Sequence, residues 1–342
     1  MNGLSKDAVT WLTVDDTSAG QRIDNYLCRI LKGVPKSHVY RILRSGEVRV
    51  NKGRAAPDRR LAVGDVVRLP PVRTATREPR SAAAAKPAPA RAFRIPVLYE
   101  DDAFLALDKP AGLAVHGGSG VSHGLIEQLR AARPAARFLE LVHRLDRDTS
   151  GVLLVAKQRS ALLALHAALR SGDVDKRYHV LVRGRWRDAV RTVRAPLHKF
   201  ATKEGERRVR VDAEGRASET VFRRIATWPK HDPPLALLEA ELMTGRTHQI
   251  RVHLAHIGFV LAGDDKYGDF TWNKALHAQG LRRMFLHAHR LALRHPVSRE
   301  PLIVESPLPE DLAAFVGALG EPASAAGTPA SAPPRTDRAV CS

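Results

Sequence analysis

Nine consecutive residues, 143–151, hold the side chains of this chain that are best suited to chemistry. They read His-Arg-Leu-Asp-Arg-Asp-Thr-Ser-Gly, so two carboxylates alternate with basic groups just before a turn-forming Thr-Ser-Gly. The next five residues, 152–156, are continuously apolar and predict a buried strand. Charged groups at the mouth of a buried strand are costly unless they have a use. The pattern therefore indicates a reactive site with Asp146 and Asp148 as its candidate acids.

Two later segments carry polar side chains that could complete such a site. Residues 176–178 read Lys-Arg-Tyr and belong to an alternating, strand-like stretch that runs to 182. Residues 244–254 read Thr-Gly-Arg-Thr-His-Gln-Ile-Arg-Val-His-Leu, and we predict a helix here that is capped by Thr247. A carboxylate can act as a nucleophile or as a general base. A nearby arginine would stabilise its ionised form, and a tyrosine offers a flat ring for stacking.

In this order the three segments resemble the RluA family of pseudouridine synthases, and most closely its RluC type, which modifies 23S ribosomal RNA. The resemblance maps Asp146 onto the catalytic Asp, Tyr178 onto the active-site Tyr and Arg251 onto the basic residue that pairs with the Asp. It extends to residues 108–112, 116–118 and 263–268. It implies that the N1–C1′ bond of a uridine is broken and that C5 is joined to C1′, with no cofactor. A covalent ester at Asp146 and a glycal route both stay open.

The same resemblance suggests how the substrate is held. An enzyme that acts on a base must take it out of its stack, and Arg144 corresponds to the residue that fills the resulting gap. We expect His143 to support the loop or to touch phosphate. Arg246 either contacts RNA or closes an ion pair, and Leu254 is assigned to the substrate-binding set. Asp148 is interpreted as a turn or ion-pair residue.

Charge and composition favour a nucleic-acid partner. The 342 residues include 55 Lys and Arg against 36 Asp and Glu, a formal net charge of +19, so a polyanion is the expected partner. No apolar run approaches the ~18 residues of a membrane span. Two cysteines, Cys28 and Cys341, exclude a disulfide framework and favour a reducing cytoplasm. Five histidines lack the carboxylate or Cys partners of a metal site, so we expect no metal: His248, His253, His256, His287 and His289.

The N-terminal segment, 14–72, resembles the S4 RNA-binding module. It combines two predicted helices, the second starting at Ser37, with short strands near 48–51 and 66–69. Such a module presents basic side chains to a phosphate backbone, which positions a protein but does not read sequence. The candidates are Arg22, Lys36, Arg41, Arg44, Arg49 and Lys52. The alternative is that these groups form an ordinary solvated surface.

The rest of the chain divides by composition. Residues 73–92 form an Ala/Pro-rich basic linker, and residues 319–342 form a disordered tail, because neither stretch has enough large apolar residues for a core. Residues 93–318 form the catalytic domain, in which strands outnumber helices and are joined by short turns. We therefore predict an α+β fold with a mixed, largely antiparallel sheet.

Three alternative functions remain open. The chain could carry out the same reaction on another structured RNA, or be a non-catalytic RNA-binding ribosome assembly factor that lost the reaction. It could also be a hydrolase in which Asp146 and water release free uracil. The function that we predict in preference to these three is that of a monomeric enzyme that acts on 23S ribosomal RNA without a membrane or a small-molecule cofactor.

Overall fold

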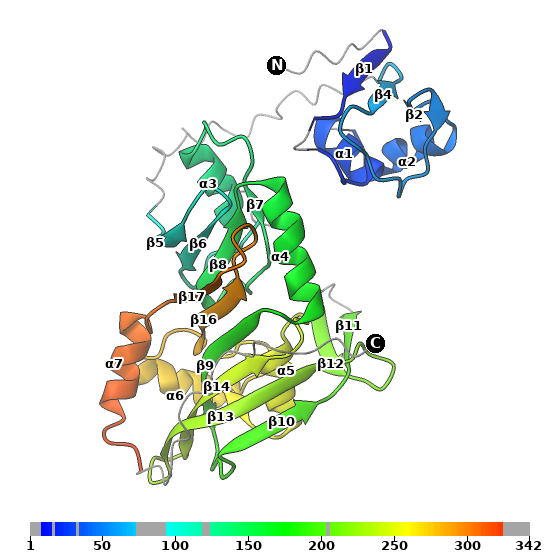
Figure 1. The fold of residues 1–342 in the computed structure, drawn as a ribbon. Coiled ribbons are helices and arrows are strands. Elements are labelled where there is room, and N and C mark those ends of the chain that lie inside the picture. Colours follow the sequence, from blue (N-terminus) through cyan, green and yellow to red (C-terminus); the bar gives the residue numbers. More distant parts are fainter. Residues whose placement is uncertain are drawn as a thin grey trace, which may run out of the picture. The chain divides into compact units, whose positions relative to one another are not determined.

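The computed structural model describes residues 8–15, 18–31, 34–72, 94–117, 124–202 and 206–323 (Figure 1). The chain forms two compact units that divide between residues 91 and 92. The predicted linker, 73–92, lies outside the described residues, and so does the predicted tail from 324 onward. The first tail residues, 319–323, are held to the second unit. There the Gly320 carbonyl accepts a hydrogen bond from Trp228 Nε1 at 2.9 Å, and the Ala323 N–H donates to the Thr227 carbonyl at 2.8 Å.

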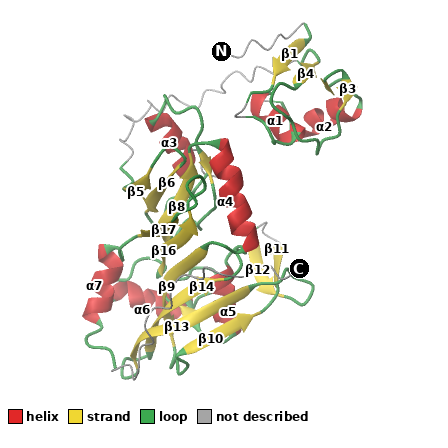
Figure 2. Ribbon diagram, in the orientation of Figure 1, coloured by secondary structure: helices red, strands yellow, loops and turns green. Residues whose placement is uncertain are grey.

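The first unit packs two short helices against a small antiparallel sheet (Figure 2). Its helices are α1 (Ile23–Ile30) and α2 (Lys36–Arg44). Its strands are β1 (Thr10–Thr13), β2 (Arg49–Val50), β3 (Gly53–Arg54) and β4 (Val66–Leu69), in the order β1-β4-β2-β3. Apolar residues at helical spacing, such as Ile23 and Leu27, meet the strand residues in one buried core.

The second unit is built on one sheet to which eleven of the described strands belong. Its main order is β10 (Val190–Arg194), β13 (Glu219–Trp228), β14 (Leu235–Leu242), β9 (Asp175–Arg183), β16 (Leu286–Arg294), β8 (Ser150–Ala156), β6 (Phe104–Lys109) and β5 (Val97–Glu100). Three short strands pair beside this path: β7 (Glu140–Leu141), β15 (Val260–Leu261) and β17 (Pro301–Glu305). Only the β16–β8 pair is parallel among the described pairings. The predicted α+β class with a mixed, largely antiparallel sheet is confirmed.

Helices and one hairpin complete this unit. The helices are α3 (Leu125–Ala132), α4 (Arg159–Ser171), α5 (Gln249–His256), α6 (Phe270–Ala278) and α7 (Glu310–Ala318), and the hairpin joins β11 (Leu197–Ala201) to β12 (Arg207–Val211). None of the helices within the described ranges has the length and apolar character needed to cross a bilayer.

The predicted helix starts need correction. Ser37 lies inside the first turn of α2, which Pro35 precedes as N-cap. Thr247 does not cap α5, whose N-cap is His248 with a left-handed φ of 53°. The N-cap side chain makes no capping hydrogen bond. The Gln249 side chain instead ties α5 to the loop before it, because its Oε1 accepts from the Arg246 N–H at 3.0 Å.

Strand β8 is the centre of the unit. Leu153 and Val155 point into one buried cluster, while Val152 and Leu154 point into a second cluster on the other face. Burial on both faces explains the continuous apolar run in the sequence. Gly151 has a φ of 109°, and a Cβ there would collide with the Ala288 carbonyl of β16. A glycine is therefore required where the reactive loop enters this strand.

Candidate active site

One pocket of about 770 Å³ in the second unit gathers most of the predicted site residues. Its walls come from the loop 143–149, the start of β9, the last turns of α4, the loop after β14 and the start of α5. The predicted residues that line it are His143, Arg144, Asp146, Tyr178, Arg246 and Arg251. Segments far apart in the sequence therefore converge on one cavity.

Hydrogen bonds to the backbone fix the loop that carries Asp146. The Thr149 N–H donates to the Asp146 carbonyl at 3.2 Å and closes the turn. The Leu154 N–H of β8 donates to His143 Nε2 at 3.1 Å. Burial and the neighbouring Lys176 charge lower the pKa of His143 to about 4. His143 is therefore neutral near pH 7, and its ring anchors the loop to the strand, one of the two roles that we expected for it.

Lys109 supports the same loop from its buried side, a role that the sequence did not suggest. Its ammonium is fully buried and donates to the Arg147 carbonyl at 2.9 Å. It also donates to the carbonyls of Pro110 and Leu113, each at 2.8 Å. Burial lowers the pKa of Lys109 to about 7, while Asp148 opposes that shift. Three carbonyls thus use all three donors of one buried lysine.

Asp146 faces the pocket, with 20% of its side chain exposed. Its Oδ2 lies 3.4 Å from Arg251 Nη1 and 3.8 Å from His248 Nε2. The structure thus brings Asp146 and Arg251 together, as the sequence predicted. The 3.4 Å contact is long for a charge-assisted hydrogen bond, so the carboxylate keeps lone pairs that a substrate could reach.

Arg251 is itself held by an acid to which sequence reasoning gave no role. Asp264 accepts from Arg251 Nε at 2.7 Å and from Nη2 at 2.6 Å, a bidentate pair whose carboxylate is fully buried. Burial opposes this ionisation, but the Arg251 hydrogen bonds outweigh it and hold the pKa of Asp264 below its usual value. The guanidinium also lies 5.1 Å from the centre of the Tyr267 ring. Arg251 is therefore locked on one side and presents Nη1 to Asp146 on the other.

Tyr178 lies in β9 on the pocket face and is 7% exposed. Its hydroxyl has no hydrogen-bond partner among the residues that the structure describes. Burial, together with the Asp146 charge, raises the pKa of the phenol above its usual value. Tyr178 is therefore a neutral phenol that opens onto the pocket, with a flat ring and one unused donor.

The remaining predicted residues fall into distinct settings. Arg144 is exposed at the pocket. Arg246 also lines the pocket and donates through Nε to the Ala217 carbonyl at 3.3 Å. Asp148 pairs with its neighbour Arg147 at 3.0 Å, so the predicted ion-pair role is confirmed. Leu254 needs correction: it is 0% exposed and packs in the core, so it cannot contact a substrate.

Two of the five histidines are buried and hydrogen-bonded within the fold. His253 is fully buried, and its ring nitrogens lie 2.9 Å from the Thr220 hydroxyl and 3.0 Å from the Ser218 hydroxyl. His287 is likewise buried, 2.9 Å from the Ser150 hydroxyl. Within the described ranges, no three His, Cys, Asp or Glu side chains are grouped as a metal ion would need.

The six basic candidates of the first unit are all exposed: Arg22, Lys36, Arg41, Arg44, Arg49 and Lys52. Two of them form ion pairs within the unit. Arg22 lies 2.7 Å from the buried Asp24, and Arg41 lies 3.4 Å from Glu47. Arg22 and Arg41 are therefore partly used within the unit, whereas the other four candidates form no ion pair within the described ranges.

Comparisons with known proteins agree with this geometry. Residues 103–256 match the family model described as RNA pseudouridylate synthase, and residues 21–67 match the S4 domain. Ribosomal large subunit pseudouridine synthase C of Yersinia pestis is 53% identical over 304 residues, covering 89% of this chain and 93% of the relative. The protein of the same name from Escherichia coli K12 is 53% identical over 303 residues, covering 88% and 93%.

Solved structures agree at the level of the fold. Human RNA Pseudouridylate Synthase Domain Containing 4 superposes with a TM-score of 0.54 at 24% identity, covering 65% of this chain and 92% of the human one. The second unit thus has the fold of this human protein, and the relatives match both units. The chain belongs to the RluA-type family of RNA pseudouridine synthases and carries an S4 domain at its N-terminus.

Proposed function

We propose that this protein converts uridines of 23S ribosomal RNA into pseudouridines, with Asp146 as the catalytic group. The observation that carries the proposal is the convergence of Asp146, Tyr178 and Arg251 in one pocket of a chain whose relatives are named for this activity on the large ribosomal subunit. In this proposal the protein acts in the cytoplasm as a monomer. It needs no cofactor, because the reaction exchanges no atoms or electrons with a second substrate.

The chemistry assigns a separate task to each group. The base leaves its stack and enters the pocket, while Arg144 fills the gap in the RNA. Asp146 acts at the ribose, either on C1′ as a nucleophile or on a neighbouring proton, and the N1–C1′ bond breaks. The uracil turns and C5 bonds to C1′, while the ester to Asp146 breaks or, on the other route, Asp146 returns the proton to the ribose. The C5 proton then leaves and N1 takes up a proton, so the product has the composition of the substrate.

Arg251 sets the charge state of Asp146, and Tyr178 sets the position of the base. Arg251 stabilises the carboxylate before the reaction, and its bidentate bond to Asp264 keeps it from turning away. Tyr178 places its ring against the uracil and offers a hydroxyl hydrogen to a uracil oxygen. As a neutral phenol it can receive the C5 proton only while passing on its own.

The first test is turnover on 23S ribosomal RNA, with pseudouridines located by chemical probing of the product. Asp146→Asn is expected to abolish pseudouridine formation while RNA binding stays close to that of the wild type. Asp148→Asn is the matched control, because this neighbouring acid pairs with Arg147 and does not line the pocket. Turnover by Asp146→Asn near the wild-type level would refute the assignment.

The same reaction mixture separates the alternatives. Free uracil in place of pseudouridine would identify a hydrolase, and RNA binding without any product would identify an assembly factor. Loss of activity with a chelator would show that a metal ion takes part.

A further inference from the structure

Two lysines of the second unit are buried, and they differ in how their charge is compensated. Lys109 is 0% exposed and is surrounded by three carbonyls. Lys176 is 9% exposed and lines the pocket, and its ammonium forms no hydrogen bond or ion pair with any residue in the described ranges. Most of the Lys176 side chain is therefore buried, while its ammonium opens onto the pocket with no protein partner in the described ranges, so the charge is available to an anion that enters the pocket.

The acid beside Lys176 in the sequence does not compensate it. Asp175 is engaged by Arg177 at 2.9 Å and by Arg290 at 3.0 Å. Because successive residues of a strand point to opposite faces, Asp175 and Arg177 lie on one face of β9 while Lys176 and Tyr178 share the pocket face. Burial lowers the pKa of Lys176, and Asp175 only partly opposes this shift.

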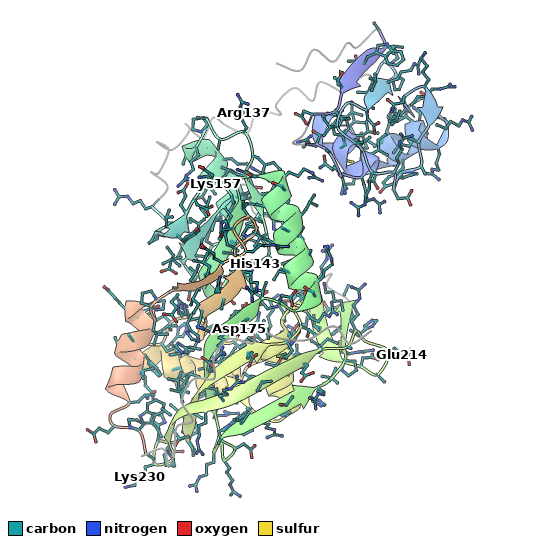
Figure 3. All side chains as sticks on the ribbon, viewed as in Figure 1. Arg137, His143, Lys157, Asp175, Glu214 and Lys230 are labelled. Carbon is teal, nitrogen blue, oxygen red and sulfur yellow. The ribbon has the colours of Figure 1, made fainter. Side chains whose placement is uncertain are left out.

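The surrounding wall of the pocket is basic. His143 lies on the same side, beside the last turns of α4 (Figure 3), where His166 and Arg170 also line the cavity. Arg170 and Arg144 are exposed, and neither side chain has an ion-pair partner within the described ranges. Asp146 is the only carboxylate among the lining residues. Burial lowers the pKa of both His143 and His166, so the cations at this end of the pocket are Lys176, Arg144 and Arg170, and Asp146 is the one acid that they share the lining with.

We propose that Lys176 binds a phosphate of the RNA backbone next to the flipped uridine. This inference rests on the proposed function, because a phosphodiester is the anion that an RNA substrate brings into the pocket. Tyr178 and Lys176 project from one strand two residues apart, about 7 Å along β9. The bound phosphate is therefore that of the flipped nucleotide or of its immediate neighbour. Arg170 and Arg144 would guide the adjoining backbone toward it.

The test compares Lys176→Met, which keeps the length of the side chain and removes its charge, with Lys176→Arg, which keeps the charge. The matched control is Lys230→Met, because Lys230 is exposed on the loop between β13 and β14 (Figure 3). Each variant is made alone for turnover and together with Asp146→Asn for binding, so that affinity is measured without reaction. The ligand is a 23S ribosomal RNA fragment, titrated at several salt concentrations.

Lys176→Met is expected to weaken RNA binding roughly tenfold to a hundredfold, as for a lost charge-assisted hydrogen bond. Its slope of log affinity against log salt should fall by about 0.7, the value for one phosphate contact on a single strand. Its melting temperature should equal or exceed that of the wild type, because an uncompensated buried charge is removed. Lys176→Arg should restore most of the affinity and the slope, and Lys230→Met should match the wild type.

Three outcomes would overturn the inference. Unchanged affinity and salt slope in Lys176→Met would show that no phosphate is bound there. A lower kcat with both binding quantities unchanged would place the amine on the reacting base. A markedly lower melting temperature would reveal a structural role. Failure of the wild type to form pseudouridine would instead refute the proposed function, and the salt slope would still decide whether Lys176 binds phosphate.

Discussion

Asp264 offers the sharpest test of how the pocket is organised, because its neighbour Asp265 is a built-in control. Both acids reach the same guanidinium: Asp264 through two bonds of 2.6 and 2.7 Å, and Asp265 through one of 3.3 Å. Their burial differs completely, since the Asp264 side chain is 0% exposed and that of Asp265 is 57% exposed. Asp264→Asn and Asp265→Asn thus remove the same negative charge from the neighbourhood of one guanidinium, in the first case at a buried position and in the second at an exposed one.

The expected magnitudes follow from that difference. Removing one partner of a buried pair costs about 3–5 kcal/mol, and Asn keeps part of the hydrogen bonding, so we expect about 3 kcal/mol for Asp264→Asn. An exposed pair is worth about 0–1 kcal/mol, which sets the expectation for Asp265→Asn. Turnover should fall on the order of 10²-fold in Asp264→Asn, because Arg251 is released and can close onto Asp146, the carboxylate that must stay available. It should change little in Asp265→Asn.

Urea unfolding followed by tryptophan fluorescence reports mainly on the second unit, which holds Trp186, Trp228 and Trp272; in every protein compared, Trp11 of the first unit is replaced by Phe to remove its signal. The pKa of Asp264 is lowered in the folded state, so its contribution is present above the ordinary Asp value of about 4 and is lost as the pH falls through the folded value. The difference in free energy of unfolding between the wild type and Asp264→Asn should therefore be largest at pH 7 and should decrease in acid. Equal stability and equal turnover of the two variants would refute this account of Arg251.

Three further predictions concern groups around the pocket and in the first unit. Tyr178→Phe should leave the free energy of unfolding nearly unchanged, since the hydroxyl has no partner within the described ranges, but should slow turnover about 10²-fold; full activity would show that only the ring matters. The pKa of His143 in the folded state is lowered to about 4. As the pH falls from 6.5 to 4, the free energy of unfolding of the wild type should therefore decrease by up to about 3 kcal/mol relative to that of His143→Gln. Urea midpoints of the two proteins that change in parallel over that range would contradict this. Replacing both Arg44 and Arg49 by Gln should flatten the salt dependence of RNA binding by about 0.7–0.9 per lost phosphate contact, whereas an unchanged slope would remove these residues from the RNA-binding surface.

The parts of the fold with a strong local signal could be predicted from the sequence. Strand β8 is buried on both faces and therefore shows an unbroken apolar run, and α4 ends at Gly172 in the left-handed conformation that its sequence indicates. Strand β13 was not predicted, because arginines interrupt its apolar alternation. Strand β14 pairs with it from Thr220 to Trp228, and β10 pairs with its first half, so tertiary pairing decides its structure where the local pattern is weak.

The same distinction applies to the site. Asp146, Tyr178 and Arg251 were found because each sits in a recognisable motif. Asp264 lies in a Gly-Asp-Asp-Lys-Tyr-Gly stretch that reads as a turn, and nothing in the sequence separates it from Asp265. Lys176 lies in the Lys-Arg-Tyr segment that the sequence marks as part of the site, but the sequence does not show that its side chain is buried. Both depend on burial, which arises from segments that meet only in the folded chain.

The contacts of Arg251 explain why an arginine is needed at this position. One edge of its guanidinium, Nε and Nη2, is used by Asp264, and the other, through Nη1, faces Asp146. A lysine would supply one compact charge, and it could not hold a fixed bidentate bond while presenting a second donor in a set direction. Because the guanidinium is planar and rigid, its two bonds to the buried Asp264 also fix the direction in which Nη1 faces Asp146. The environment of the Asp146 carboxylate therefore depends on a second acid, Asp264, whose side chain is fully buried.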